Sequence, residues 1–572
     1  MDNLVFEESI SSEVSQSEFI SKKWLYVNDI NNGSYSSQII IDSTPLANSG
    51  GYVNWSEAYI AMPLVITLSA SAGTVGDDAS LVGNHSWAFK SGFWHMINSM
   101  SVEFNNQNIV QQTPFLNVFR SFKAMTSFSE DDLKQGPSLG FSPDTAGSWA
   151  FSAADSQNGK GLSNNRTTPD MVLSGTGTIA SAGIASAFGA QTNPSNDNAF
   201  GSQYSHNAGF AKRNEWYGYT PTQTSKGQQL IMGEADSAVV FRSRRLPETT
   251  TGLSDTKAGW AVMAKLRLKD LSDYFDKCPL LKGSTMRFLI NTNQSTTTFT
   301  TTATAGTEQA KATGLSAISA SSQGLTNPMM IASGARQQGC SNLADATYTL
   351  KVAIYKEDNV SPFTVPVRLY APVYKMNPIA EQRYLSLAPT KRVEYCDIFQ
   401  YQFNDIGAGQ SFNFLVSNGI PNIKSVLVVP FLSATGNGTT YNTLLSPTST
   451  SGATPDPVAL SQFNILISGV NLFLNNQLYD FEQFNHELKS SNQLNGSLTT
   501  GLASGLISED DFARGMRYYY GNASRVLPSE EGVSRSVQIL GINQCLKAIN
   551  LMVFVEFKKS MTIDISTGAR LD

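Results

Sequence analysis

The chain has 572 residues, of which 41% are hydrophobic and 15% charged, and its formal net charge is −6. This length exceeds what one hydrophobic core usually supports, so we expect two large domains or one domain with large insertions. The negative charge argues against a protein that coats nucleic acid, because every phosphate contact needs Lys or Arg. The 10% of aromatic residues argues against a disordered chain.

The first 20 residues form a polar, acidic segment. They carry Asp2, Glu7, Glu8 and Glu13 and contain no Lys or Arg, unlike the basic arms that gather nucleic acid. They also lack the basic and apolar regions of a signal peptide, and no apolar run in the chain approaches the ~20 residues of a membrane-spanning helix. We therefore expect an N-terminal arm that orders only against a neighbouring molecule, and a protein that is made in a cytosol and not secreted.

Short runs of β-branched and aromatic residues, punctuated by Gly, Asn, Pro or Ser, predict β-strands from residue 22 onward. They lie at 22–27, 37–42, 58–68, 97–104, 237–243, 260–268, 285–291, 348–355, 367–374, 412–416, 425–432, 463–474, 516–520, 537–542 and 549–557. Helical periodicity occurs only at 113–128, 268–277 and 480–489. Many strands with few helices predict an all-β fold of antiparallel sandwiches.

An internal repeat predicts that the two halves of the chain are related. Three landmarks recur in the same order. Pro63 matches Pro430 within an apolar run, the turn Asn105–Gln107 matches Asn475–Gln477 before an aromatic helix, and Ser129–Asp132 matches Ser508–Asp511. We therefore expect two similar sandwiches in tandem, and we expect the Asn-Asn-Gln turns at equivalent strand ends.

The positions of these landmarks indicate that the first half of the chain is much longer than the second. Two segments account for the excess: residues 137–235 are rich in Gly, Ser, Ala and Asn, and residues 294–346 are rich in Thr, Ser and Ala. Both are typical of long loops on a rigid scaffold. We expect a division into an arm at 1–20, a first domain at 21–380 that carries both loops, and a second domain at 381–572.

The segment from residue 20 to about 140 resembles a known family. The resemblance rests on the stretches KKWLYVNDINNGSYSSQIIID, AYIAMPLVITL, and EFNNQNIV followed by TPFLNVFRSFKAMTSFSEDDL. They are similar to the major capsid proteins of polinton-like viruses and their virophage relatives, double-stranded DNA viruses of the double jelly-roll lineage. The matching residues are packing and turn residues, so the resemblance implies a fold and a structural role rather than a site.

No pattern in the chain predicts a catalytic, cofactor or metal site. The four histidines, His85, His95, His206 and His486, have no metal-binding spacing and are expected to be structural. The cysteines Cys278, Cys340, Cys396 and Cys545 are scattered and are expected to be free thiols. We expect a protein that is not an enzyme.

The repeated Ser-Glu-Asp-Asp sequence leaves two readings open. Ser129 and Ser508 with the acids that follow them have the oxygen ligands that calcium prefers. The same residues fit a helix N-terminus, where the serine caps the helix and the acids favour its dipole. We favour capping.

Two groups of residues are candidate contacts between subunits. Arg242, Arg244 and Arg245 form the densest basic run and are a candidate patch for an inter-subunit contact or for the inner face of a shell. The aromatic residues of the first long loop are candidate trimer contacts, because a neutral loop with spaced anchors is typical of a segment that orders against a neighbour: Trp149, Phe151, Phe188, Phe200, Phe210, Trp216 and Tyr217.

The resemblance implies a capsid protein in which three copies, each with two sandwiches, form a six-cornered capsomer that tiles an icosahedral shell. It also implies penton and minor capsid proteins as partners, an internal membrane as a further candidate, and no direct sequence-specific contact with nucleic acid. The alternative is a carbohydrate-binding β-sandwich surface protein, which should expose aromatic platforms. A β-rich glycoside hydrolase, with two carboxylates flanking a cleft, is a third candidate.

Overall fold

The structure is a computed structural model of the chain. It describes residues 18–70, 85–143, 213, 243–245, 251–253, 257–303, 310–314, 326–333, 346–387, 389–432, 458–473, 479–490, 505–514, 516–524, 532–545, 548–565 and 567–571.

Eight strands of the second half form a jelly roll. One sheet has the order β16 (Thr390–Ile406), β23 (Ile549–Asp564), β18 (Ile423–Leu432), β21 (Tyr519–Asn522). The other has the order β17 (Ser411–Pro421), β22 (Ser534–Asn543), β19 (Leu460–Ile467), β20 (Val470–Asn471). Numbered within the sandwich, the strands run 1-8-3-6 and 2-7-4-5, the order of the two interlocked Greek keys of a jelly roll.

The first half contains the same eight strands in the same order. One sheet includes β1 (Phe19–Asn28), β15 (Arg368–Met376), β4 (Tyr59–Ala70) and β9 (Lys257–Arg267), and the other is β2 (Gln38–Asp42), β10 (Met286–Thr292), β6 (Ile97–Phe104) and β7 (Gln107–Val110). The prediction of two tandem jelly rolls is therefore confirmed. We call them the first and the second sandwich.

The first sandwich carries additional strands and short helices. The strands are β3 (Tyr52–Val53), β5 (His85–Phe89), β8 (Ser243–Arg245), β11 (Ser295–Ala303), β12 (Ala310–Gly314), β13 (Met329–Ser333) and β14 (Ala346–Ile354). The helical segments are α2 (Thr44–Ala47), η1 (Phe93–Met96), α4 (Leu116–Ser127), α5 (Glu130–Leu133), α6 (Gly136–Leu139), α11 (Leu268–Leu271) and α12 (Asp273–Lys277). Among the later residues that the structure describes, the helices are α13 (Pro378–Leu387), α15 (Phe481–Ser490) and α16 (Glu509–Arg514).

The prediction of a long loop at residues 294–346 is wrong where the structure describes this segment, which is largely strand there. Strands β11, β12 and β13 lie in this segment, and β11 pairs with β14 from Ser295 to Thr301. The error comes from treating a Thr-rich run as loop, although Thr is β-branched and favours extended backbone. Strands β11 and β12 extend a sheet of the first sandwich through β14, whereas β13 pairs with β5 in a separate two-stranded sheet.

The alignment of the two Asn-Asn-Gln turns is also wrong. Asn105 and Asn106 have positive φ and form the β6–β7 hairpin turn. In the second sandwich the corresponding β19–β20 turn is Ser468–Gly469, also with positive φ at both residues. Asn475–Gln477 follows β20 and lies outside the described residues. The duplication is carried instead by strand order, with Pro63 and Pro430 in corresponding strands β4 and β18.

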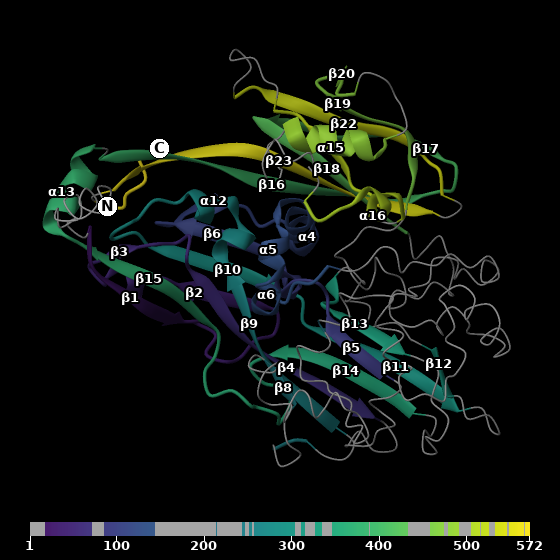
Figure 1. The fold of residues 1–572 in the computed structure, drawn as a ribbon, viewed down its shortest axis with the longest axis horizontal. Coiled ribbons are helices and arrows are strands. Elements are labelled where there is room, and N and C mark those ends of the chain that lie inside the picture. The colour runs from purple at the N-terminus through teal and green to yellow at the C-terminus, as the bar shows by residue number, and fades with distance from the viewer. Residues whose placement is uncertain are drawn as a thin grey trace, which may run out of the picture.

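The two sandwiches lie one above the other with helices between them (Figure 1). The purple and teal strands of the first sandwich lie below α4 and α12, and the green and yellow strands of the second lie above them. Nearly all residues of strand β23 from Ile549 to Phe557 are buried. The strand is a continuous apolar run because both faces of its sheet are covered. In the described part of the chain, no helix has the length and hydrophobicity needed to cross a membrane.

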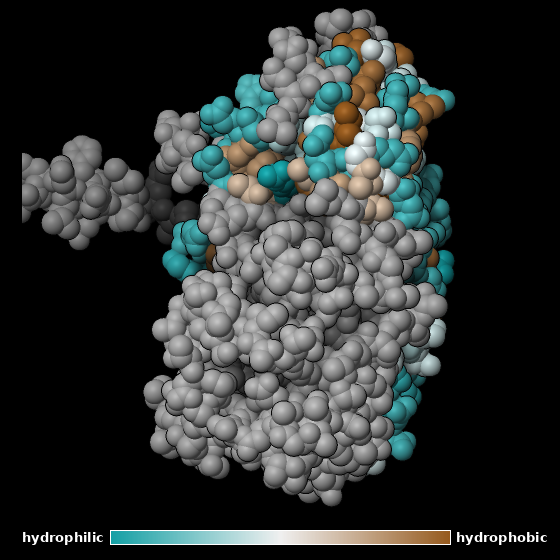
Figure 2. All heavy atoms as spheres, turned by 90° about the vertical axis from the view of Figure 1, so that its right-hand side faces the viewer, coloured by the Kyte–Doolittle hydropathy of each residue, from teal (hydrophilic) through white to brown (hydrophobic). Residues whose placement is uncertain are grey.

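Figure 2 shows the side of the molecule that lies on the right in Figure 1. At the end that belongs to the second sandwich, hydrophobic and hydrophilic side chains of the described residues are intermixed.

Candidate functional site: the seam between the two sandwiches

The contact between the sandwiches, which we call the seam, is built by β7, α4 and α12 of the first sandwich and β16, β18, β21 and β23 of the second. Helix α4 forms because Val118, Phe119, Phe122 and Met125 recur at helical spacing, and all four are buried. Part of this apolar surface belongs to the first sandwich, and part of it faces the second.

Aromatic rings make the apolar part of the seam. Phe119 of α4 lies 5.5 Å from Phe554 of β23, measured between ring centroids. Phe122 lies 5.1 Å from Tyr518 and 5.6 Å from Tyr520. Ring pairs at these separations add stabilisation beyond the burial of their area. The helix therefore anchors the sheet of the second sandwich at two of its strands, β23 and β21.

Hydrogen bonds to backbone groups fix the register across the seam. The Thr113 hydroxyl donates to the Ile398 carbonyl at 2.6 Å, and the Tyr395 hydroxyl donates to the Ile109 carbonyl at 2.8 Å. The Gln111 amide donates to Asp397 at 3.1 Å. Because each of these bonds ties a side chain of one sandwich to a fixed backbone group of the other, together they favour one arrangement of the sandwiches over a sliding contact.

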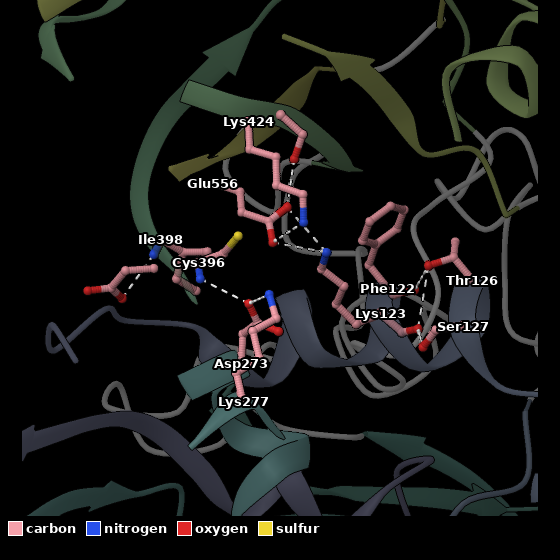
Figure 3. Close-up of polar contacts among 12 residues, drawn as sticks. Phe122, Lys123, Thr126, Ser127, Asp273, Lys277, Cys396, Ile398, Lys424 and Glu556 are labelled. Carbon is pink, nitrogen blue, oxygen red and sulfur yellow. Dashed lines mark hydrogen bonds and ion pairs between the residues drawn. The ribbon is translucent and has the colours of Figure 1, made fainter. Parts of the chain in front are cut away.

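The seam also contains a buried charge cluster, shown in Figure 3. Lys123 of α4 points to Glu556 of β23, with Nζ 3.2 Å from each carboxylate oxygen. Lys424 lies 3.5 Å from the same carboxylate, and the Ser425 hydroxyl donates to it at 2.8 Å. Burial disfavours the charged form of Glu556, but the two ammonium groups and the Ser425 hydroxyl outweigh it and lower its pKa from 4.5 to about 2. Glu556 is therefore ionised and bridges two cations.

Two further carboxylates extend the cluster. Asp397 accepts a hydrogen bond from Lys559 at 2.8 Å. Asp273 of α12 accepts one from the Cys396 amide at 2.9 Å and one from Lys277. Burial acts to raise the pKa of Asp273, but Lys277 and the Cys396 amide reverse the effect and lower it. Each of these carboxylates has a cationic partner, as burial of charge requires.

A cavity of about 290 Å³ lies at the seam, lined by Arg120, Lys123, Asp270, Asp397 and Glu556 among others. Burial lowers the pKa of the Arg120 guanidinium, against the attraction of the surrounding carboxylates. Among the described residues its Nε has no hydrogen-bond partner. A cavity of this size with polar walls has room for bridging water. In the described part of the chain, no three His, Cys, Asp or Glu side chains gather to hold a metal ion.

The capping reading of the Ser-Glu-Asp-Asp repeat is confirmed. Ser129 and Asp132 exchange hydrogen bonds as a capping box at the start of α5. At α16, the Ser508 hydroxyl accepts from the Asp511 amide at 3.1 Å and donates to the Asp511 carboxylate at 2.7 Å. Both serines therefore begin corresponding helices in the two sandwiches.

His95 is a structural histidine, as expected. It is buried, and its ring nitrogens lie 3.2 Å from the Asn117 amide and 3.0 Å from the Ser121 hydroxyl. Burial, aided by the nearby cations Lys90 and Arg213, lowers its pKa well below the ordinary range. His486 is exposed on α15, and the side chains of His85 and His206 lie outside the described part. Cys278 and Cys396 are buried free thiols, as expected.

The predicted contact residues are for the most part outside the described residues. This holds for all seven aromatic residues of the first loop, namely Trp149, Phe151, Phe188, Phe200, Phe210, Trp216 and Tyr217, and for Arg242. Arg244 and Arg245 lie in strand β8, paired with Ala261 and Trp260 of β9. From the same loop, Arg213 is described and buried, and it donates hydrogen bonds to the Phe89 and Ser142 carbonyls of the first sandwich.

The sequence reasoning missed the seam. Glu556 is an acid within the apolar run INLMVFVEF, and Lys123 is a cation within an aromatic helix. Each was a signal of a buried ion pair, since lone charges in apolar elements are rarely buried without a partner. Their separation of 433 residues concealed that they pair with each other.

Neither a protein-family profile nor a curated protein matches the chain. Among solved structures it is similar to a chain of the Sputnik virophage, with 9% identity, a TM-score of 0.49, and coverage of 98% of this chain and 89% of that one. It is also similar to the mavirus major capsid protein, with 9% identity, a TM-score of 0.43 and coverage of 99% and 94%. A third similar structure is the Faustovirus major capsid protein, with 10% identity, a TM-score of 0.44, and coverage of 97% of this chain and 94% of that one. Because these TM-scores are below 0.5, the jelly-roll assignment rests on the strand order of this chain.

Proposed function

We propose that the chain is the major capsid protein of a double-stranded DNA virus related to polinton-like viruses and virophages. The observation that carries this proposal is the pair of jelly rolls joined by a buried, charge-paired seam into one block. Two similar sandwiches in fixed relation give a subunit with two nearly equivalent corners. Three subunits in a closed ring then present six corners, which suit a flat lattice of one repeated protein.

In this proposal, residues 21–380 and 381–572 are the two domains of the block, and residues 1–20 are an arm that orders on assembly. The chain acts in the virion as a structural protein rather than an enzyme, after assembly inside the host cell. Its partners are further copies of itself, penton and minor capsid proteins, and a candidate internal membrane. It makes no direct sequence-specific contact with nucleic acid, in keeping with its net charge of −6.

The loop aromatics from Trp149 to Tyr217 are proposed trimer contacts, and Arg242, Arg244 and Arg245 a proposed basic contact patch. The carbohydrate-binding alternative has one observation in its favour. Trp24 and Tyr26 of β1 are 48% and 51% exposed, so the first sandwich does present aromatic rings to solvent.

Native mass spectrometry of the purified full chain separates these functions. A capsid protein is expected to give trimers and larger particles, because its contacts reinforce one another in a lattice. A protein that stays monomeric at every concentration tested, and binds a glycan, would contradict the proposal.

A further inference from the structure

Corresponding sheets of the two sandwiches differ in how they are covered. In the second sandwich, a row of paired residues crosses the sheet from Gln400 through Phe554 and Leu427 to Tyr520. Helix α4 lies on this row, since Phe119 contacts Phe554 and Phe122 contacts Tyr520. The outer face of this sheet is thus covered by a helix of the other sandwich.

The corresponding row of the first sandwich runs from Tyr26 through Tyr370 and Tyr59 to Arg267. Its strands β1, β15, β4 and β9 occupy the same places as β16, β23, β18 and β21. No described element of the chain covers it as α4 covers the second sheet, and Tyr26 remains 51% exposed. The two sheets thus correspond in strand order, but among the described residues only the sheet of the second sandwich has a helix on its outer face.

This uncovered face is an ordered aromatic cluster, which we call the ring face: Trp24, Tyr26, Tyr59 and Tyr370. Tyr59 stacks on Tyr370 at 5.2 Å, Trp24 lies 5.6 Å from Tyr59, and Tyr26 lies 5.9 Å from Tyr370. Rings on rigid strands lose little entropy when they bind, and Trp and Tyr are enriched among the residues that dominate interface energies.

Cations surround the ring face. Lys265 Nζ lies 4.2 Å from the centre of the Tyr59 ring, and the Arg368 guanidinium lies 4.2 Å from that of Tyr26. Lys22 lies 5.7 Å from the Trp24 ring and pairs with Glu57. The expected partner surface is therefore polar, with at least one carboxylate.

Helix α15 is the counterpart of α4. Each follows the fifth strand and precedes the sixth strand of its own sandwich, and each is followed by a serine-capped helix. Its inner side is buried through Phe484 and Leu488. Its outer side carries Glu482, His486 and Lys489, which are exposed and share one helix face. Glu482 is a carboxylate that can pair with a cation beside the ring face, such as Lys265 or Arg368.

We propose that the ring face of one copy binds the outer side of α15 of a second copy, so that a polar helix face covers this sheet between chains, where the aromatic face of α4 covers its counterpart within the chain. The contact joins unlike surfaces, so it closes into a ring when successive rotations permit. The inference deepens the proposed function, since it names the surfaces through which copies meet, and it rests on that function.

The first test is a Trp24→Ala, Tyr26→Ala, Tyr370→Ala variant, compared by native mass spectrometry with the wild type and with Leu387→Ala as the control. Leu387 is 77% exposed on α13 and makes none of the ring contacts of the ring face. We expect the triple variant to stay folded by circular dichroism and to raise the dissociation constant of the oligomer at least about 100-fold, as loss of several ring anchors implies. Leu387→Ala should leave it unchanged.

The second test locates the partner surface. Tyr26→Cys and His486→Cys variants are co-expressed and treated with a short thiol crosslinker. We expect linked dimers from the co-expressed pair and none from either variant alone, because the contact joins unlike surfaces. Links from Tyr26→Cys alone would show a symmetric contact and overturn the inference.

The outcomes separate the inference from the function. Wild-type trimers with an equally tight triple variant would overturn the ring-face contact and leave the capsid function intact. A monomeric wild type would contradict the function itself. Binding of a plain oligosaccharide that the triple variant loses, without any oligomer, would assign the ring face to carbohydrate and overturn the inference.

Discussion

Lys123 of α4 and Glu556 of β23 are separated by 433 residues in the sequence, and their charged groups lie 3.2 Å apart at the centre of the seam. The pair joins the helix of one sandwich to the sheet of the other. Its lysine and glutamate side chains are only 16% and 5% exposed. A rigid double block, which the proposed function requires, depends on such contacts remaining intact.

Replacing Glu556 by Gln should destabilise the protein by about 3–5 kcal/mol, because Lys123 and Lys424 would lose the carboxylate between them and remain buried. Urea unfolding followed by tryptophan fluorescence measures the change. The matched control is Glu394→Gln, since Glu394 forms an exposed pair with Arg392, with side chains 64% and 58% exposed. That control should cost less than about 1 kcal/mol. Equal effects would show that the seam pair does not hold the sandwiches together.

Stability should fall in acid through the same residue. Lys123, Lys424 and Ser425 hold the pKa of Glu556 at about 2 in the folded protein, below the ordinary value of 4.5. A lowered folded pKa gives stability that is present above pH 4.5 and lost as the pH falls towards 2. Unfolding free energies measured from pH 6 to pH 2 should decline more steeply for the wild type than for Glu556→Gln. Parallel curves would contradict this assignment.

A pair of glycine substitutions tests the packing of the second sandwich against α4. Gly505 and Gly469 both have positive φ, but a Cβ at Gly505 would lie 2.5 Å from the Met125 carbonyl oxygen, whereas at Gly469 it would meet nothing within 4 Å. Gly469→Ala should cost only the backbone strain, about 1–2 kcal/mol. Gly505→Ala should cost at least about 1 kcal/mol more, because backbone must move to admit the methyl group. Thermal unfolding of both variants measures the difference, and equal costs would show that the approach to α4 is loose.

The fold was predictable from the sequence to a large extent because the strands repeat a simple pattern. Alternation in runs such as MRFLIN places Met286, Phe288 and Ile290 on the buried face, and this signal is local. The 17-residue strand β16 was missed, because charged and polar residues from Lys391 to Asp405 interrupt its apolar pattern. Helix α13 was missed as well, since it has no buried residues and hence no apolar stripe.

The seam was beyond sequence reasoning for a different reason. Asp397 is an ordinary surface residue in its local pattern, and it is buried where one sandwich docks on the other, beside the half-buried Lys559. The partners come from distant parts of the chain, so no local window contains both. The exposure of Trp24 and Tyr26 could not be predicted from the sequence either, because the composition of a strand does not show which face of its sheet is left open.

The first long loop has a prediction of its own. Replacing residues 145–210 with a short Gly-Ser linker removes five of the proposed contact aromatics, namely Trp149, Phe151, Phe188, Phe200 and Phe210. It retains Arg213, whose bonds to Phe89 and Ser142 belong to the first sandwich. We expect weaker trimers of a folded chain, because anchors that order against a neighbour would be lost. Trimers of unchanged affinity by native mass spectrometry would show that this loop is outer decoration.

Electron microscopy of the purified full chain tests the central claim most directly. If the two sandwiches form one block and three blocks close a ring, projections should show particles with six similar corners and the mass of three chains. Adding crowding agent or salt should bring these particles together edge to edge into flat hexagonal sheets or shells. Single two-lobed particles that never associate would contradict the account.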